Sequence, residues 1–192
     1  MYADQGSSST LERLVYEAAV GRDYLSALPS WTQEKNQMRV IYAYEDVHDV
    51  AFHPTIFLAG PTPRSPEVPS WRPEAVRLME GCEGTLYIPE PRAGAFNPDE
   101  QVKWEWDALA AAQHILFWVP RDLNTMPAFT TNVEFGYWVA KNYLKVTLAY
   151  PKMAPKMSYL HKLADKQGIP VYHALYEALM SIVKRESRNG NR

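Results

Sequence analysis

The stretch Ile115-Leu116-Phe117-Trp118-Val119, followed by Thr130-Thr131-Asn132-Val133-Glu134-Phe135-Gly136-Tyr137-Trp138, decides the fold class of this chain. The first segment is a short apolar run, typical of a strand that is buried on both faces of a parallel sheet. The second segment predicts a helix from about Asn132 to Asn142, with Glu134 in its first turn. A helix that starts just past such a strand lies at the carboxyl edge of the sheet, where open α/β sheets bind their ligands.

The same alternation of short apolar strands and helices extends along the chain in both directions. Predicted strands cover residues 39–44, 55–59, 85–88, 115–119 and 145–149, and a short edge strand covers 169–172. Pro170 removes one ladder donor from that edge strand. One predicted helix begins after Ser70 and ends before Gly81. Four more cover about 100–112, 132–142, 155–167 and 174–186. This order predicts an α/β domain with a parallel sheet covered by helices on both faces.

The chain has 192 residues, which is enough for one α/β domain with a sizeable core. We expect residues 1–38 to form an N-terminal extension that is partly helical or disordered, with disorder over residues 1–8 and a short helix from Thr10 to about Val20. Residues 39–186 are predicted to form the domain, and residues 187–192 a polar tail.

Composition excludes several classes of protein. Lys plus Arg is 20 and Asp plus Glu is 22, a net charge of −2, so a nucleic-acid partner is not expected. A single cysteine, Cys82, excludes an internal disulfide and a cysteine-based zinc cluster and favours a cytoplasmic location. The histidines show no metal-binding spacing, and no apolar run of about 18 residues predicts a membrane span.

Glu134 is the first candidate for chemistry. Thr131-x-x-Glu134 matches a capping box, in which the glutamate only reaches back to the backbone of the cap residue. The alternative is a reactive carboxylate that the helix N-terminus keeps ionised, with a lowered pKa, as a nucleophile requires. Gly136 leaves room there for a ligand or a neighbouring backbone.

The second candidate is the segment Gln101 to Asp107. On a helix, Gln101 and Glu105 share a face with Ala108 and Ala112, and that small face can border a cavity. Glu105 and Asp107 point about 200° apart, so at most one of them faces a site. The alternative is a solvated helix face with two tryptophans packed at its edges.

The third candidate is Gly60-Pro61-Thr62-Pro63-Arg64, at the end of the predicted strand 55–59. Gly60 allows a ligand to approach the backbone, and Thr62 and Arg64 can bind hydroxyl or phosphate oxygens. The motif is neither a P-loop nor a dinucleotide fingerprint. The alternative is a plain rigid turn.

Several segments, in this order, resemble the nucleoside 2-deoxyribosyltransferase-like family over roughly residues 39 to 175. They are Ile56 to Arg64, Trp71-Arg72, Ile88-Pro89-Glu90, Gln101, Trp104-Glu105, Phe117 to Arg121, Met126 to Phe129, Thr130 to Trp138, Tyr150-Pro151 and Lys156 to Leu160. The most specific blocks are Gly-Pro-Thr-Pro-Arg and Thr-Thr-Asn-Val-Glu-Phe-Gly.

The resemblance implies a flavodoxin-like, three-layer α/β/α fold, here expected with a parallel five-stranded sheet. It implies cleavage of the N-glycosidic bond of a nucleoside or nucleoside 5′-monophosphate, with Glu134 as the nucleophile and the sugar passed to another base or to water. The implied reaction requires neither a metal nor an organic cofactor, and the resemblance suggests a homo-oligomer. We expect Gly60, Pro61, Thr62 and Arg64 to bind substrate.

One departure from the family pattern matters. Better-studied transferases carry an aspartate six residues before the nucleophile, where this chain has Ala128. Glu105 is the first expected substitute for that acid, with Asp107 and Glu90 behind it. Trp104 or Phe129 is expected to stack on the base, and Asn132 to orient Glu134. Two alternatives stay open: a non-catalytic nucleotide-binding sensor or sequestering module, and a structural domain without a site.

Overall fold

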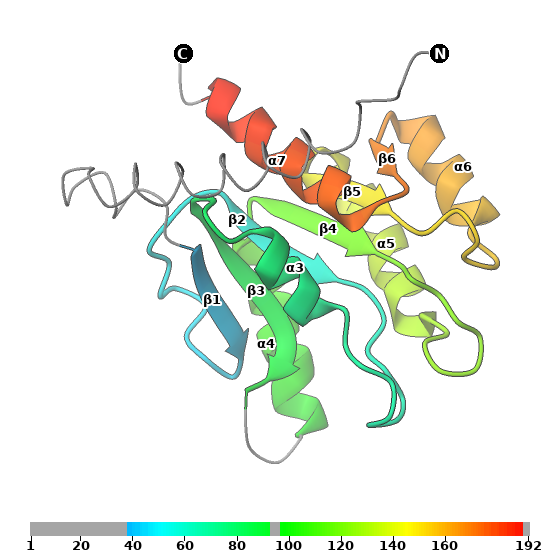
Figure 1. Ribbon diagram of the computed structural model, residues 1–192, viewed down its shortest axis with the longest axis horizontal. Helices are drawn as coiled ribbons and strands as arrows, with labels where there is room; N and C mark the ends of the chain where they lie inside the picture. Colours follow the sequence, from blue (N-terminus) through cyan, green and yellow to red (C-terminus); the bar gives the residue numbers. More distant parts are fainter. Residues whose placement is uncertain (1–37, 93–96, 190–192) are drawn as a thin grey trace, which may run out of the picture. The chain divides into compact units, whose positions relative to one another are not determined.

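The computed structural model describes residues 38–92 and 97–189. In this part of the chain the strands form a parallel sheet of six, in the order β1-β3-β2-β4-β5-β6 (Figure 1). The strands are β1 (Met38–Ala43), β2 (Thr55–Ala59), β3 (Gly84–Pro91), β4 (His114–Trp118), β5 (Val146–Ala149) and β6 (Val171–Tyr172).

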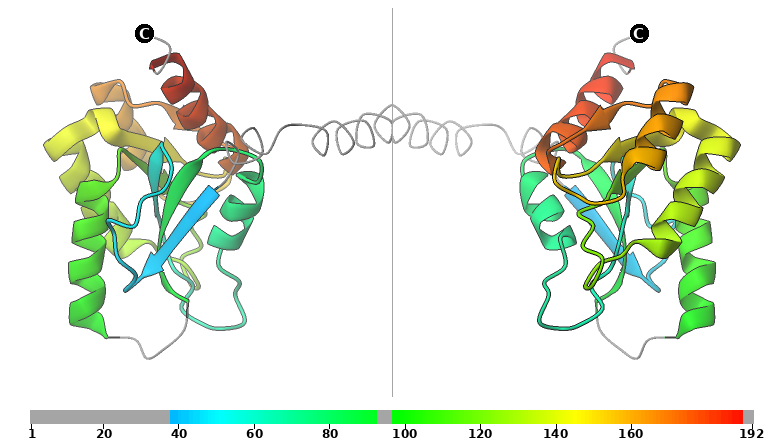
Figure 2. Two further views of the ribbon diagram at one scale, coloured as in Figure 1. Left: turned by 90° about the vertical axis from the view of Figure 1, so that its left-hand side faces the viewer. Right: turned by 90° about the vertical axis from the view of Figure 1, so that its right-hand side faces the viewer.

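Helices cover both faces of the sheet (Figure 2). They are α3 (Arg72–Leu78), α4 (Pro98–Ala111), α5 (Phe129–Asn142), α6 (Ser158–Gln167) and α7 (Leu175–Asn189), with a 3-10 turn at Tyr143–Lys145. Buried side chains of α3 and α7 share one apolar cluster with the sheet, and those of α4, α5 and α6 share the other. The predicted α/β class with a parallel sheet is therefore confirmed.

The sheet has six strands, so the prediction of five was wrong in number. The order β3-β2-β4-β5-β6 is the five-strand order of a flavodoxin-like sheet. Strand β1 is the addition: it pairs in parallel with β3, from Met38 opposite Gly84 to Tyr42 opposite Ile88. Its side chains Ile41 and Ala43 are buried, so pairing at this edge extends the core by one strand.

The central strands are apolar because both of their faces are covered. Every residue of β2, β4 and β5 is buried, including the aromatic rings of Phe57, Phe117 and Trp118. The Phe117 ring meets that of Phe135 on α5 edge to face, with centroids 5.2 Å apart. Burial of such rings contributes most of the core energy per residue.

The carboxyl ends of β2 and β4 mark the point where the chain changes direction across the sheet. The loop after β2 leads to α3 on one face, whereas the loop after β4 leads to α5 on the other. Diverging loops leave a crevice outside the strand ends, which is where sheets of this type bind ligands.

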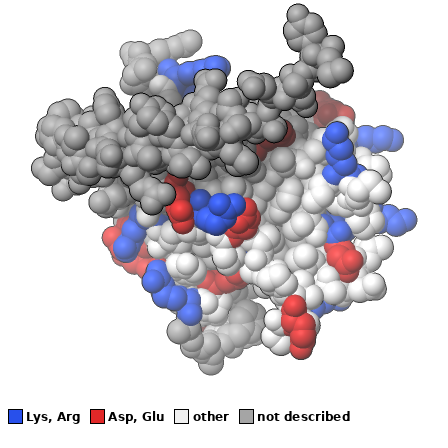
Figure 3. Space-filling model, in the orientation of Figure 1, with Lys and Arg blue, Asp and Glu red and all other residues white. Residues whose placement is uncertain are grey.

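The two ends of the domain differ from the predicted boundaries in how far the structure describes them. The helix predicted between Thr10 and Val20 lies outside the described residues, whereas α7 continues to Asn189, into the predicted polar tail. No helix in the described part of the chain has the length and apolarity that crossing a bilayer requires. On the face seen in Figure 3, acidic and basic side chains are interspersed.

Candidate active site

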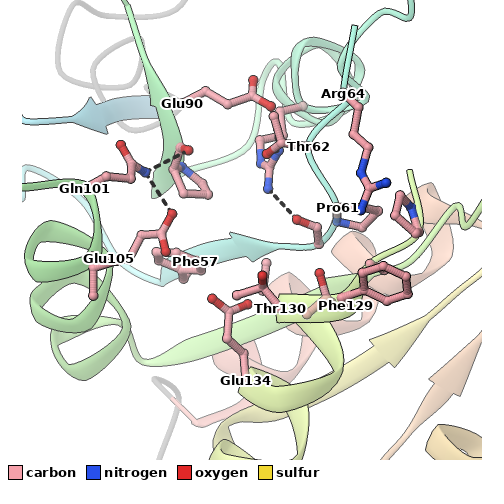
Figure 4. A pocket seen from close by; sticks show the side chains of 18 of the residues that line it. Phe57, Pro61, Thr62, Arg64, Glu90, Gln101, Glu105, Phe129, Thr130 and Glu134 are labelled. Carbon is pink, nitrogen blue, oxygen red and sulfur yellow. Dashed lines mark hydrogen bonds and ion pairs between the residues drawn. The ribbon is translucent and has the colours of Figure 1, made fainter. Parts of the chain in front are cut away.

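A pocket of about 470 Å³ lies at the carboxyl edge of the sheet, in the crevice between the β2 and β4 loops (Figure 4). The end of β3 and the first turns of α4 and α5 complete its wall. Most of the predicted site residues line it: Gly60, Pro61, Thr62, Arg64, Glu105, Phe129 and Glu134. The fold thus brings together three segments that are far apart in sequence.

Three predicted site residues do not line this pocket. Asp107 is exposed on α4 and pairs with Lys103 at 3.1 Å. The Trp104 indole is buried against Phe57 and donates to the Glu45 carbonyl at 2.7 Å. The Asn132 side chain accepts a hydrogen bond from Arg121, so its recorded partner is not Glu134.

Helix α5 starts earlier than predicted, and the capping box at its start is not formed. The N-cap is Ala128, in the left-handed conformation at φ 60° and ψ 39°, with no side-chain cap. The Asn132 amide already donates to the Ala128 carbonyl at 3.2 Å, as in a regular helix. Glu134 therefore lies in the second turn, with its carboxylate directed into the pocket and not back to a cap residue (Figure 4).

The environment of Glu134 raises its pKa from 4.5 to about 7. The largest cause is burial, the second is the nearby carboxylate of Glu105, and the positive charge of Arg72 opposes both. The expected lowering by the helix N-terminus was wrong, because that effect fades beyond the first turn, whereas desolvation acts wherever water is excluded.

The raised pKa of Glu134 predicts a stability that falls as pH rises. Since the folded protein holds this proton more tightly than the unfolded chain, the free energy of unfolding decreases between pH 4.5 and about 7. The contribution of this group is about 3 kcal/mol. Urea unfolding at a series of pH values measures it, and Glu134→Gln should flatten the curve in that window. An unchanged slope in the variant would contradict the assignment.

Glu105 reaches the pocket from α4, whose start is capped by the Asn97 side chain. Burial is the main cause that raises the pKa of Glu105, and a hydrogen bond from Gln101 and the charge of Arg72 lower it. The Gln101 amide donates to Glu105 at 2.7 Å and to the Pro89 carbonyl at 3.1 Å. The prediction that Gln101 and Glu105 share a helix face is confirmed.

Sequence reasoning missed the role of Arg72 in this wall. Its side chain is only 1% exposed and forms an ion pair with Glu90 at 2.5 Å. It also donates to the Leu58 and Gly60 carbonyls, at 3.1 and 2.8 Å. Arg72 and Glu90 stood among the segments that carry the family resemblance, but no local spacing links them, because the pair joins α3 to β3.

Close packing between two strands requires the absence of a side chain at Gly60. A Cβ atom at this position would lie 2.1 Å from the Trp118 carbonyl oxygen and 2.9 Å from the Trp71 ring. The missing side chain therefore lets the ends of β2 and β4 approach each other. At Gly136, by contrast, a Cβ atom would meet nothing within 4 Å.

A comparison with protein families matches this chain to the model described as nucleoside 2-deoxyribosyltransferase like, over residues 53–152. That span is just over half of the chain. The chain belongs to this family. All the residues that line the pocket fall within the matched span. No curated protein sequence matches the chain.

Ala128, where the resemblance implies an aspartate, lines the pocket as the N-cap of α5. Glu105 and Glu90 supply the carboxyl groups that line the pocket besides Glu134. Within residues 38–92 and 97–189, no three His, Cys, Asp or Glu side chains are grouped so that they could hold a metal ion.

Proposed function

We propose that this protein cleaves the N-glycosidic bond of a nucleoside or nucleoside 5′-monophosphate. The observation that supports this best is the pairing of Glu134 with Glu105 in one pocket at the edge of the sheet. One carboxylate that attacks and one carboxyl group that handles the proton are the two parts of a retaining glycosidase mechanism. The family to which the chain belongs supports the same class of substrate.

In the proposed reaction, the Glu134 carboxylate attacks the anomeric carbon while the bond from that carbon to the base nitrogen breaks. The transition state resembles an oxocarbenium ion, and the departing nitrogen takes a proton from Glu105. The product is a glycosyl ester on Glu134. A second base or a water molecule then attacks the same carbon, releases Glu134 and returns a proton to Glu105.

The electrostatics of the two carboxyl groups allow them to share one proton. Both pKa values are raised, and the pKa of Glu134 is about 7, so the pair holds a proton below neutral pH. Two coupled acids titrate as one system, and the proton can occupy either of them. With the proton on Glu105, the pair contains the ionised nucleophile and the acid that bond cleavage requires.

The rim of the pocket supports binding of a flat base or of a phosphate group. Phe129 is 66% exposed there, and the Arg64 guanidinium lies 5.3 Å from the centre of its ring. Arg64 forms no ion pair with an acid of the described residues, so its charge is available to a ligand. Guanidinium groups bind phosphate with two parallel hydrogen bonds.

Arg64→Ala is expected to raise KM about tenfold for nucleoside 5′-monophosphates and to change KM little for nucleosides. Steady-state kinetics with each nucleoside and its monophosphate measures the difference. Arg92→Ala is the matched control, since Arg92 pairs with Glu45 at 3.2 Å and does not line the pocket. Equal effects on both substrates would argue against a phosphate role.

The proposed activity is tested by incubating the protein with nucleosides and nucleoside 5′-monophosphates and following free base by chromatography. A second base in the mixture distinguishes transfer from hydrolysis, because transfer yields a new nucleoside. Tight binding of a nucleotide without any product would instead support a sensor or sequestering module, a role that the exchange of the family aspartate for Ala128 favours.

We also propose that the chain forms a homo-oligomer, in the cytoplasm. Trp106 and Val133, on α4 and α5, are 71% and 72% exposed and line an apolar groove of about 360 Å³. Helix α4 begins with acidic residues, and α5 carries Lys141 in its last turn. Both helices connect parallel strands and so run in the same direction. A two-fold axis perpendicular to these helices would bring the acidic end of α4 towards the basic end of α5 in a second copy.

Trp106→Glu is expected to weaken self-association at least about tenfold, because it places a charge in an apolar contact. Sedimentation velocity at a series of concentrations measures the change. Tyr159→Glu is the control, since Tyr159 is equally accessible, at 77%, but lies on α6. Monomeric wild-type protein at high concentration would rule the oligomer out.

A further inference from the structure

Thr62 and Glu90 lie on the wall of the pocket opposite Glu134 (Figure 4). Arg72 also lines the pocket and binds both of them. The Arg72 guanidinium donates to the Leu58 and Gly60 carbonyls through Nε and Nη2. Its Nη1 donates to Thr62 Oγ1 at 3.1 Å and to Glu90 Oε1 at 2.5 Å. Nearly all of its five N–H donors are therefore used inside the protein, so Arg72 is suited to position its neighbours and not to bind an anion.

Thr62 presents a hydrogen-bond donor to the pocket. Its oxygen accepts from Arg72, so the proton of its own hydroxyl is free to donate. The side chain is exposed and lines the cavity.

Glu90 presents an acceptor beside it. Its Oε1 takes hydrogen bonds from Arg72 and from the Ser70 hydroxyl, at 2.5 and 2.8 Å. No donor among the described residues binds its second oxygen, Oε2, and the side chain is 20% exposed in the pocket. A carboxylate held in this way can only accept hydrogen bonds.

The donor and the acceptor lie on the same side of Arg72. Thr62 Oγ1 and Glu90 Oε1 bind the same Arg72 nitrogen, so at most about 5.6 Å separates them, and the free oxygen Oε2 belongs to that same carboxylate. One ligand hydroxyl can therefore reach the Thr62 hydroxyl and the Glu90 carboxylate together. A hydroxyl group suits this place, because it donates and accepts at once. A phosphate does not suit this place, because it would lie directly against the Glu90 carboxylate, which repels an anion.

We propose that Thr62 and Glu90 form a subsite for one hydroxyl group of the substrate sugar, with Arg72 as the positioning residue. This inference rests on the proposed function, since it takes the ligand to be a nucleoside. The two groups of the ligand then occupy different parts of the pocket. The sugar hydroxyl lies at the wall formed by Thr62 and Glu90, and a 5′-phosphate lies at the rim beside Arg64.

The test measures binding to the Glu134→Gln protein, so that no turnover interferes. The probes are adenosine, guanosine, cytidine and uridine, each compared with its 2′-deoxy, 3′-deoxy and 5′-deoxy derivative by titration calorimetry. Removal of one particular hydroxyl should weaken binding about 10- to 100-fold. With Thr62→Val or Glu90→Gln added, the same removal should cost less than about threefold, because the partner is already lost. Thr62→Ser keeps the donor and should retain the full effect.

Each outcome separates the subsite from the enzyme activity. The subsite is overturned if Thr62→Val and Glu90→Gln weaken the binding of each nucleoside and of all its deoxy derivatives by the same factor. It is also overturned if the effect of these substitutions depends on the base and not on the hydroxyl that is removed. If it is overturned while the wild type releases base, the proposed function stands alone. Coupling to one hydroxyl without any turnover by the wild type supports the subsite and overturns the activity. If no nucleoside binds, both fall.

Discussion

Glu134→Gln is expected to lower the rate of base release by at least about 10³-fold while leaving the fold intact. The amide has nearly the shape of the carboxylate but is a poor nucleophile, so the ester with the sugar cannot form. The variant also removes an ionisable group whose pKa burial raises to about 7, so its stability above neutral pH should equal or exceed that of the wild type. Chromatography of free base and circular dichroism measure the two effects.

Asp107→Asn provides the matched control for the loss at Glu134. Asp107 lies on α4, close in sequence to Glu105, but it is exposed and pairs with Lys103 outside the pocket. The rate of base release by the Asp107→Asn protein should stay within about twofold of the wild-type rate. A Glu134→Gln protein with full activity would eliminate the proposed nucleophile, whatever the effect of Asp107→Asn.

Arg72→Met is expected to lower the free energy of unfolding by about 3–5 kcal/mol. The change leaves the Glu90 carboxylate, which is only 20% exposed, without its cation. It also leaves the Leu58 and Gly60 carbonyls without the donor that binds them. Urea unfolding followed by tryptophan fluorescence measures the loss, at a pH where Glu134 is ionised in both proteins.

Arg77→Met is the control on the same helix. Arg77 pairs with Glu74 at 2.6 Å, but both side chains are largely exposed, at 62% and 50%. Water already screens this pair, so its loss should change the free energy of unfolding by less than about 1 kcal/mol. Equal losses at the two positions would contradict the view that burial makes Arg72 important. Adding Glu90→Met to Arg72→Met should restore part of the stability, because it removes the unpaired charge.

The strands and helices followed well from the sequence, because their signals are local. Apolar runs marked the strands β2, β4 and β5, whose residues are all buried. Helical spacing placed Gln101 one turn before Glu105, and the two are hydrogen bonded at 2.7 Å. The extra edge strand β1 was identified as a segment, but its place beside β3 depends on pairing across the chain and not on its own residues.

The start of α5 did not follow from the sequence. Thr131-x-x-Glu134 imitates a capping box, whereas the helix begins at Phe129 after Ala128 in a left-handed conformation. Alanine carries no side-chain signal for that conformation, which costs about 1–2 kcal/mol and is maintained only by the surrounding structure.

By itself, the sequence determined the elements, the parallel class of the sheet and the carboxylate Glu134 near its edge, because each depends on neighbours within a few residues. Only the tertiary structure decided which groups share the pocket: Glu105 with Glu134, and Thr62 with Arg72 and Glu90. It also reversed the expected pKa of Glu134. The reason is that charge–charge interaction and desolvation depend on distance and burial in space, which spacing along the chain does not encode.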